Sequence, residues 1–261
     1  GVDKKIAYKK EASWGTIAPD TGAKQLRRVT SQFNQNAETL QSAEIRQDYQ
    51  IADYRLGSLS TEGSLNGELS PGTYSDFFAA ALAKDFVAGG ATTGASLTIA
   101  ASGSFYTITR AAGSWLTDGF YVGNVIRLSG AGFAPANVGK NIQILSITAL
   151  VLTVRTFAAN TLTPEGPIAA AGAAVVGKQT FAPLTGHTSD SFTIEEFYGG
   201  GVNVSEIHAG NKVGSIAVQL PASGFCTVDF SFMGKGMMKT GNTQHFATAT
   251  AAPTTGLTVG V

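Results

Sequence analysis

The residues that could perform chemistry in this chain of 261 residues are few and scattered. The three histidines are His187, His208 and His245, and no two of them have the spacing of a metal-binding pair. The single cysteine, Cys226, has no nearby partner and falls on the apolar side of a predicted strand, which is typical of a small buried hydrophobe. We therefore expect histidines on surface or polar faces, no metal site and no cofactor.

Two glycine-containing segments have the composition of a catalytic or phosphate-binding loop but not its spacing. Gly132 and Gly139 enclose six residues where a P-loop has four, and Asn141 follows Lys140 where the loop needs Ser or Thr. In residues 63–67 the serine stands one position too early for a nucleophile elbow. No pattern brings two carboxylates together on one pocket. We expect no catalytic residue and no enzyme, with a hydrolase of unrecognised site left as an open alternative.

The composition excludes several other classes. The chain has 18 basic and 18 acidic side chains, so its formal net charge is zero, and charged residues make up 14% against roughly 25% in an ordinary soluble domain. Hydrophobic residues make up 43%, which is too much for a disordered chain. A general nucleic-acid binder would carry a basic excess. Because little charge keeps copies apart, we expect the protein to associate with itself.

The charges are spread unevenly and suggest four regions. Residues 88–178 hold only five basic and two acidic side chains, and small-residue stretches at 89–95 and 169–174 have the composition of flexible linkers. No run approaches the roughly 18 apolar residues of a membrane helix, so we expect no membrane insertion. The expected regions are an N-terminal arm (1–23), a first core part (24–90), an inserted small β domain (91–178), and a second core part with a C-terminal tail (179–261).

One helix is predicted over residues 71–85. Pro71 follows Ser70, and residues 73–76 have the spacing of a capping box with Asp76 in place of Glu. An apolar stripe at helical spacing follows, and we expect it to pack on the outer face of a sheet. Its members are Tyr74, Phe77, Phe78 and Leu82, with Ala81 between them. A second, shorter helix over 38–47 is a weaker prediction.

The remaining pattern is that of strands and turns. Residues 59–69, 213–220 and 225–232 alternate apolar and polar side chains. Five short strands are predicted in the insert, at 96–100, 105–110, 125–128, 141–147 and 151–157, with the spacing of a small barrel or sandwich. The only charges on the polar faces of 59–69 and 225–232 are Glu62, Glu68 and Asp229. Such a face would repel a phosphate backbone, as a conduit for DNA requires.

Several ordered blocks resemble the tail tube proteins of siphophages, the phages with long non-contractile tails. The blocks are residues 12–16, 44–55, 63–74, 112–120, 212–215 and 229–234. The resemblance implies a mainly β fold, in which a two-sheet sandwich with a flanking helix contributes strands to a β-barrel shared around a ring. It also implies hexameric rings that stack into a tube for DNA ejection, in the virion tail and, during assembly, in the host cytoplasm.

The resemblance also assigns roles and partners. Glu62, Glu68 and Asp229 would face the lumen, past which DNA travels without adhering. Contacts between subunits would come from the arm through Trp14 and from the block 38–56 through Arg46, Asp48, Tyr49, Asp53 and Arg55. The partners would be other copies of the chain and the tail terminator, tape measure and distal tail proteins. A surface adhesin or receptor-binding β protein is the alternative if the insert carries the function.

Overall fold

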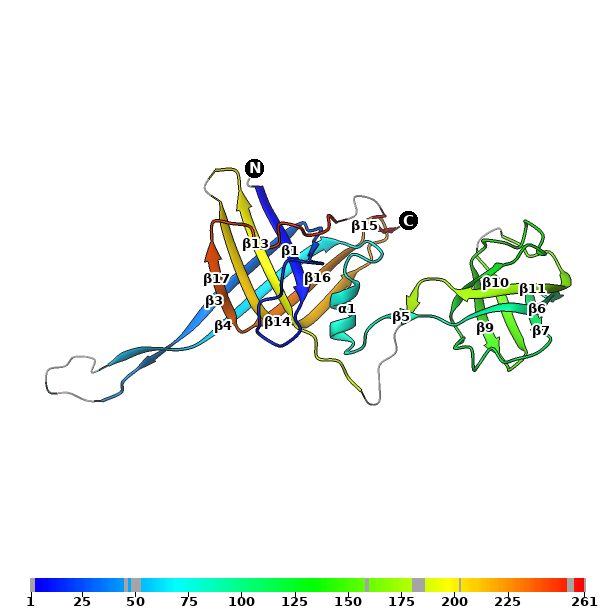
Figure 1. Ribbon diagram of the computed structural model, residues 1–261, viewed down its shortest axis with the longest axis horizontal. Helices are drawn as coiled ribbons and strands as arrows, with labels where there is room; N and C mark the ends of the chain where they lie inside the picture. The colour runs from blue at the N-terminus through cyan, green and yellow to red at the C-terminus, as the bar shows by residue number, and fades with distance from the viewer. Residues whose placement is uncertain are drawn as a thin grey trace. The chain divides into compact units, whose positions relative to one another are not determined.

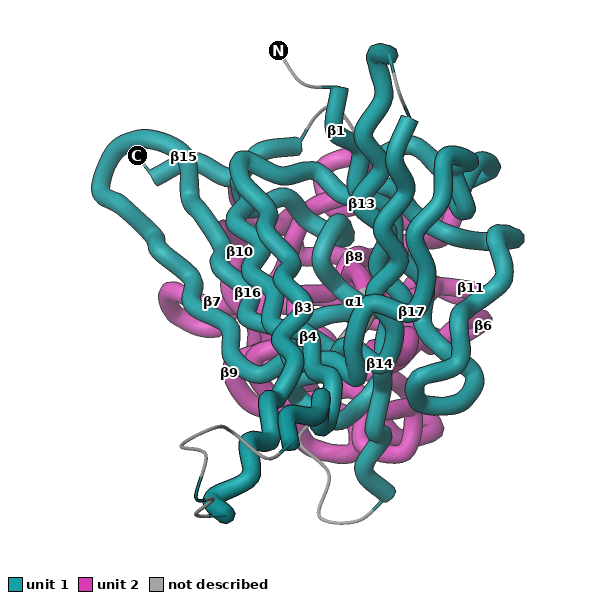
Figure 2. Tube along the Cα trace, turned by 90° about the vertical axis from the view of Figure 1, so that its left-hand side faces the viewer, with its two compact units in different colours: residues 1–85, 181–261 teal, residues 86–180 magenta. Residues whose placement is uncertain are grey.

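The computed structural model describes residues 3–44, 47, 53–157, 160–179, 186–201, 203–252 and 256–260. The chain divides into two compact units, which are considered separately: unit 1 comprises residues 1–85 and 181–261, and unit 2 comprises residues 86–180 (Figure 2). The insert was expected over 91–178, so the second unit begins five residues earlier and ends two residues later than that prediction.

Unit 1 is built from ten described strands and one helix (Figure 1). They are β1 (Asp3–Lys10), β2 (Lys24–Gln25), β3 (Thr30–Gln41), β4 (Tyr54–Glu68), α1 (Ser75–Ala81), β13 (Phe192–Gly199), β14 (Val204–Gln219), β15 (Gly224–Phe225), β16 (Thr227–Gly234), β17 (Gly236–Gly241) and β18 (Val259–Gly260).

The long strand β14 belongs to two sheets. Its first half pairs with β13 and β17 and forms sheet A, in the order β2-β1-β13-β14, with β17 on the other side of β14. Its second half, residues 212–219, pairs with β16 and forms sheet B, in the order β14-β16-β4-β3. Every neighbouring pair of strands in sheet B is antiparallel. Two sheets sharing one long strand give the mainly β, two-sheet architecture that the family resemblance implied.

The core of unit 1 lies where aromatic side chains from both sheets meet the helix. Phe77 of α1 is fully buried, and its ring centroid lies 4.7–5.3 Å from the centroids of four other aromatic rings. These are Tyr8 of β1, Phe192 of β13, and Phe230 and Phe232 of β16. The helix was expected on the outer face of one sheet, but Phe77 packs against residues of sheet A and sheet B together.

Two glycines of β4 make room for aromatic rings in this core. A Cβ atom on Gly63 would lie 2.2 Å from the Phe33 ring, and one on Gly67 would lie 2.0 Å from the Tyr74 hydroxyl. That hydroxyl donates to the backbone oxygen of Arg27 at 2.7 Å. The absence of a side chain at both positions is therefore a packing requirement, because a Cβ atom at either distance would collide.

The helix is shorter than predicted at both ends. It starts at Ser75 because Gly72, with φ of +81°, breaks the turn that begins at Pro71. The predicted capping box is wrong: no side chain caps the helix, and the Ser70 and Thr73 hydroxyls instead bond to each other at 2.5 Å. It ends before Ala83, whose φ of +52° is incompatible with a continued right-handed helix. Leu82 consequently lies past the last helical residue and is 45% exposed.

The prediction of an N-terminal arm is wrong for residues 3–10, because they form an interior strand of sheet A. β1 lies between β2 and β13, and its side chains Ile6, Ala7 and Tyr8 are buried. Four lysines surround this short apolar run and give it the composition of a surface segment. The prediction of a shorter helix over 38–47 is also wrong for residues 38–41, because they extend β3. Residues 45 and 46 of that helix, and residues 48–50 after it, lie outside the described part.

Unit 2 contains a closed six-stranded barrel in the order β10-β7-β6-β11-β8-β9. The strands of the unit are β5 (Val87–Ala88), β6 (Ala91–Ser102), β7 (Phe105–Arg110), β8 (Val125–Ser129), β9 (Ile142–Ile147), β10 (Val151–Thr156), β11 (Glu165–Val175) and β12 (Lys178–Gln179). Trp115 and Phe120 are fully buried in its core with aliphatic side chains from all six barrel strands. The five predicted strands are present. The small β-barrel predicted for the insert is therefore confirmed.

The predicted linkers of the insert are strands. Residues 169–174 belong to β11, which pairs with both β6 and β8, and residues 91–95 begin β6. Small side chains are needed here because the strands approach closely: a Cβ atom on Gly172 would lie 2.6 Å from the Ser129 hydroxyl. Outside the barrel, β5 pairs with β12, so the two ends of the insert run side by side.

Candidate assembly surface

Sheet B presents one polar face. Across β16 and β4 the register pairs Thr227 with Glu68, Asp229 with Asn66, and Ser231 with Ser64. On β3 and β14, Thr30 and Gln32 continue these rows on one side, and Ala217 and Ser215 on the other. The alternate residues Leu65, Val228, Phe230 and Phe232 are buried, so the predicted alternation holds in both strands.

The acidic side chains of this face lie on two adjacent strands. Asn66 donates to the Asp229 carboxylate at 2.5 Å, and the hydroxyls of Ser215 and Ser231 bond at 2.7 Å. Glu62 is exposed and borders a shallow hollow of about 380 Å³ with Asn34, Ser64 and Met233. Residues 30–37, 60–68, 212–219 and 227–233 contain three acidic side chains and one basic one, Lys212, which stands opposite Met233 at the end of the β14 pairing. The face is therefore weakly acidic.

The two outer strands of sheet B each have an unpaired edge among the described residues. β3 pairs only with β4, and residues 212–219 of β14 pair only with β16. The apolar side chains of this β14 edge become more exposed toward its end: Ile216 is half-buried, Val218 is 44% exposed, and Leu220, just beyond the strand, is 70% exposed. Open edges with exposed apolar residues are sites where another chain can add strands.

A two-stranded ribbon extends beyond sheet B, where the end of β3 pairs with the start of β4 (Figure 1). Its exposed apolar side chains are Leu40, Tyr54, Leu56 and Leu59. Asp53 pairs with Arg55 at 2.7 Å, whereas Arg46, Asp48 and Tyr49 lie outside the described residues. An isolated ribbon is marginally stable in water, so this one is suited to packing against another molecule.

The indole of Trp14 is fixed by a hydrogen bond at its ring nitrogen, while much of the ring remains exposed. The buried Glu11 carboxylate accepts hydrogen bonds from the backbone of Gly15 and Gly210 and fixes the turn that carries the tryptophan. The indole nitrogen donates to the Gly210 oxygen at 3.1 Å, and the Lys235 amine lies 5.6 Å from the ring centroid. The side chain is 58% exposed, so one face of a fixed ring is available for a contact.

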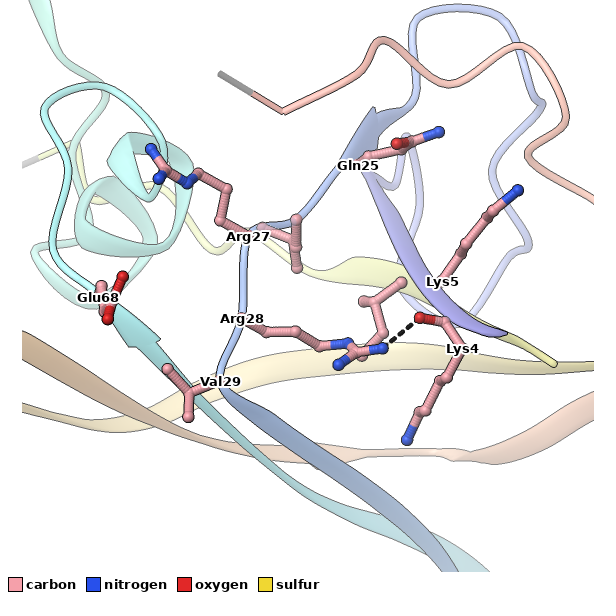
Figure 3. A pocket seen from close by; sticks show the side chains of 9 residues that line it. Lys4, Lys5, Gln25, Arg27, Arg28, Val29 and Glu68 are labelled. Carbon is pink, nitrogen blue, oxygen red and sulfur yellow. Dashed lines mark hydrogen bonds between the residues drawn. The ribbon is translucent and has the colours of Figure 1, made fainter. Parts of the chain in front are cut away.

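A basic hollow of about 420 Å³ lies at the other end of β3 and β4 from the ribbon. It is lined by Lys4, Lys5, Arg27, Arg28 and Glu68, among others. Figure 3 shows the two lysine side chains leaving β1 in opposite directions, with Arg28 reaching back to donate to the Lys4 carbonyl oxygen. The Lys4 amine pairs with Glu196 at 2.7 Å, so three cations, Lys5, Arg27 and Arg28, stand against Glu68 and make this end of the strands electropositive.

The residues first considered for chemistry do not form a catalytic arrangement. Cys226 is buried on the apolar side of sheet B, and His187 is exposed in the segment before β13. The ring of His245 contacts the Ala18 oxygen at 2.8 Å. His208, however, is buried beside Glu196 and Glu206. Sequence reasoning missed this cluster because its members come from two strands; the only signal was the alternation of Glu206 and His208 along β14.

Within the described residues, no helix has the length and apolarity needed to cross a membrane. The two open edges of the two-sheet β fold offer surfaces on which further copies of a chain can add strands. The sequence model of the phage tail tube protein family matches residues 1–260, and the chain belongs to that family. No curated protein matches the chain. It is therefore a structural component of the virion tail that self-assembles into a tube and associates with other tail proteins, and its family is a structural family rather than an enzyme family.

Proposed function

We propose that sheet B is the assembly unit of a siphophage tail tube. The main observation behind this proposal is that the four strands of sheet B alternate in direction and that its two outer strands, β3 and residues 212–219 of β14, each have an open edge. Because the number of strands is even, β3 of one copy can pair antiparallel with β14 of the next, around a ring of any size. Joining the edges closes the sheets into one continuous barrel and leaves no edge free.

The dimensions of such a barrel suit a conduit. Six copies, the number implied by the resemblance, would contribute about 24 strands. With strands about 4.8 Å apart and tilted by about 40°, the barrel would measure roughly 48 Å between opposite backbones. Side chains would narrow this lumen by about 5 Å on each side and leave room for a DNA duplex.

The polar face of sheet B would line this lumen. Its acidic residues, Glu62, Glu68 and Asp229, would repel the phosphates of DNA, so that the duplex passes without adhering during ejection. The opposite face is filled with buried aromatic residues and cannot be turned inward without destroying the core.

Rings would stack head to tail, because an axial contact that does not close produces a filament. The ribbon and the basic hollow lie at opposite ends of β3 and β4, and therefore face neighbouring rings in such a stack. We assign the inter-subunit contacts to Trp14 and to the block 38–56, including Arg46, Asp48, Tyr49, Asp53 and Arg55. Tail terminator, tape measure and distal tail proteins would bind the ends of the tube, which assembles in the host cytoplasm.

Negative-stain microscopy of the purified protein tests the proposal, with two variants on the free edge of β14. Val218→Lys places a charge among the apolar residues of the edge, and we expect folded monomers and no tubes. Gln219→Lys adds the same charge to the next residue, on the opposite face, and we expect tubes of wild-type length. Normal tubes from Val218→Lys would refute edge pairing, and discrete oligomers from the wild type would favour the adhesin alternative.

A further inference from the structure

A cluster of potential metal ligands lies on sheet A, apart from the polar face of sheet B. Glu196 of β13 stands opposite Glu206 of β14 in the register, and His208 follows two residues later on the same side of β14. One ligand atom from each of the three side chains lies within 4.8 Å of the others. Adjacent antiparallel strands hold the three backbones at fixed spacing, so the cluster is a product of the fold.

His208 is the unusual member of the cluster. Its side chain is 1% exposed, and neither ring nitrogen has a hydrogen-bond partner among the described residues. Burial, and to a lesser degree the charge of Lys4, lower the pKa of the imidazole to about 4, so the ring is neutral at physiological pH. A buried polar group without a partner destabilises the folded state, and a ligand that bonds to it removes that penalty. A neutral imidazole with a free nitrogen is the form that binds a metal ion.

The three side chains also face open space. Together with Lys4, Tyr198 and Met237 they line a hollow of about 350 Å³, which is closed on one side by residues 31–35 of β3. The His208 ring lies 5.4 Å from the Phe33 ring. The site is therefore roomy enough for an ion and a water molecule, and it opens to solvent on the side of Glu206, which is half-buried.

The positive charge in this hollow does not match its negative charge. The Lys4 amine lies 2.7 Å from the Glu196 carboxylate and donates to the Ser31 oxygen at 3.0 Å. Desolvation first and the charge of Glu196 second raise the pKa of Glu206, whose carboxylate is the less compensated of the two. The single ammonium of Lys4 thus offsets the charge of two carboxylates only in part, and a second cation would be stabilised next to Glu206.

We propose that Glu196, Glu206 and His208 form a binding site for a divalent transition-metal ion, with the properties of a Zn²⁺ site. Two carboxylate oxygens and one imidazole nitrogen are ligands that Zn²⁺ accepts, and water supplies the fourth. Ligand atoms around Zn²⁺ lie about 3.3 Å apart, so the side chains close inward on binding. Lys4 competes for Glu196, and the ion ties β13 to β14.

The test is calorimetric titration of the full-length protein, in metal-free buffer, with ZnCl₂. We expect one Zn²⁺ per chain, and a visible absorption band when Co²⁺ replaces it. His208→Ala and Glu206→Gln should each weaken binding at least about tenfold, whereas Lys4→Met should strengthen it about tenfold because Glu196 is released. His187→Ala, which removes an exposed histidine, should change nothing.

Three results would overturn the proposal. They are the absence of Zn²⁺ binding to the wild type, binding that survives in both His208→Ala and Glu206→Gln, and equal loss in His187→Ala. The stronger binding expected of Lys4→Met cannot come from unfolding, so an unchanged or weaker affinity in that variant, with an intact circular-dichroism spectrum, also counts against the site.

Discussion

Phe77→Ala should be the most destabilising single truncation in the helix of unit 1. The ring is fully buried and is surrounded by four aromatic rings, with centroids 4.7–5.3 Å away, that come from three strands. Phe→Ala substitutions in cores cost about 3–5 kcal/mol, and the cost is highest where the surroundings cannot collapse. Three hydrogen-bonded strands hold these neighbours in place, so we expect about 4–5 kcal/mol.

Phe78→Ala is the matched control. Phe78 is the next residue of the same helix, but it is half-buried and, among the described residues, has one close aromatic neighbour, Phe230, with centroids 5.6 Å apart. Partial burial predicts a cost of about 1–2 kcal/mol. Both variants remove the same atoms and have the same helix propensity change, so the difference between them measures the surroundings of the ring.

Differential scanning calorimetry of the non-polymerised protein measures the effect. For a unit of this size, the loss predicts a fall in the Tm of unit 1 by about 10–15 °C for Phe77→Ala. The transition of unit 2 should stay in place, and fluorescence of the buried Trp115 in a Trp14→Phe background reports it. Equal shifts for the two variants, or a shift below about 4 °C for Phe77→Ala, would refute the view that Phe77 joins the two sheets.

Three further predictions concern other parts of the molecule. In metal-free buffer, the stability of unit 1 should fall by on the order of 3 kcal/mol as the pH decreases from 6.5 to 4. His208 has a pKa of about 4 when folded and 6.5 when unfolded, so it takes up its proton on unfolding; urea titrations against pH should show this slope, reduced in His208→Phe. Replacing residues 86–180 by a short turn should leave tube formation intact, as judged by microscopy, because β5 and β12 bring the ends of the insert together. The double variant Glu62→Lys and Glu68→Lys should still form tubes but slow the ejection of DNA from particles that carry it, and unchanged ejection would contradict a lumenal position.

The alternating strands were predictable because their patterns have a single physical explanation. In residues 226–232 apolar and polar side chains alternate without exception, and in residues 59–69 Thr61 is the one polar side chain on the apolar side. That side is buried at Thr61, Leu65, Val228, Phe230 and Phe232, whereas Leu59 is 47% exposed. β1 and β11 were missed for opposite reasons. In β1 a short apolar run is surrounded by lysines, and in β11 close strand packing selects Ala and Gly, which have the composition of a linker.

The assembly surface was less predictable than the fold. The acidic residues of the polar face follow from alternation within single strands, but the free edges depend on which strands pair, and pairing joins residues as distant as Glu68 and Thr227. The cluster of Glu196, Glu206 and His208 depends on the register of β13 against β14 in the same way. Periodicity reports the two faces of a strand and not its neighbours.

The register of β4 shows how the core determines the chemistry of the polar face. A slip by one residue would place Glu62 and Glu68 in the core and remove the spaces beside Gly63 and Gly67 that the rings of Phe33 and Tyr74 occupy. The buried face alone therefore fixes which residues are presented on the other side. Substitutions among the polar residues of that face leave the register unchanged, so the charge of the proposed lumen can vary without altering the edges that would close the ring.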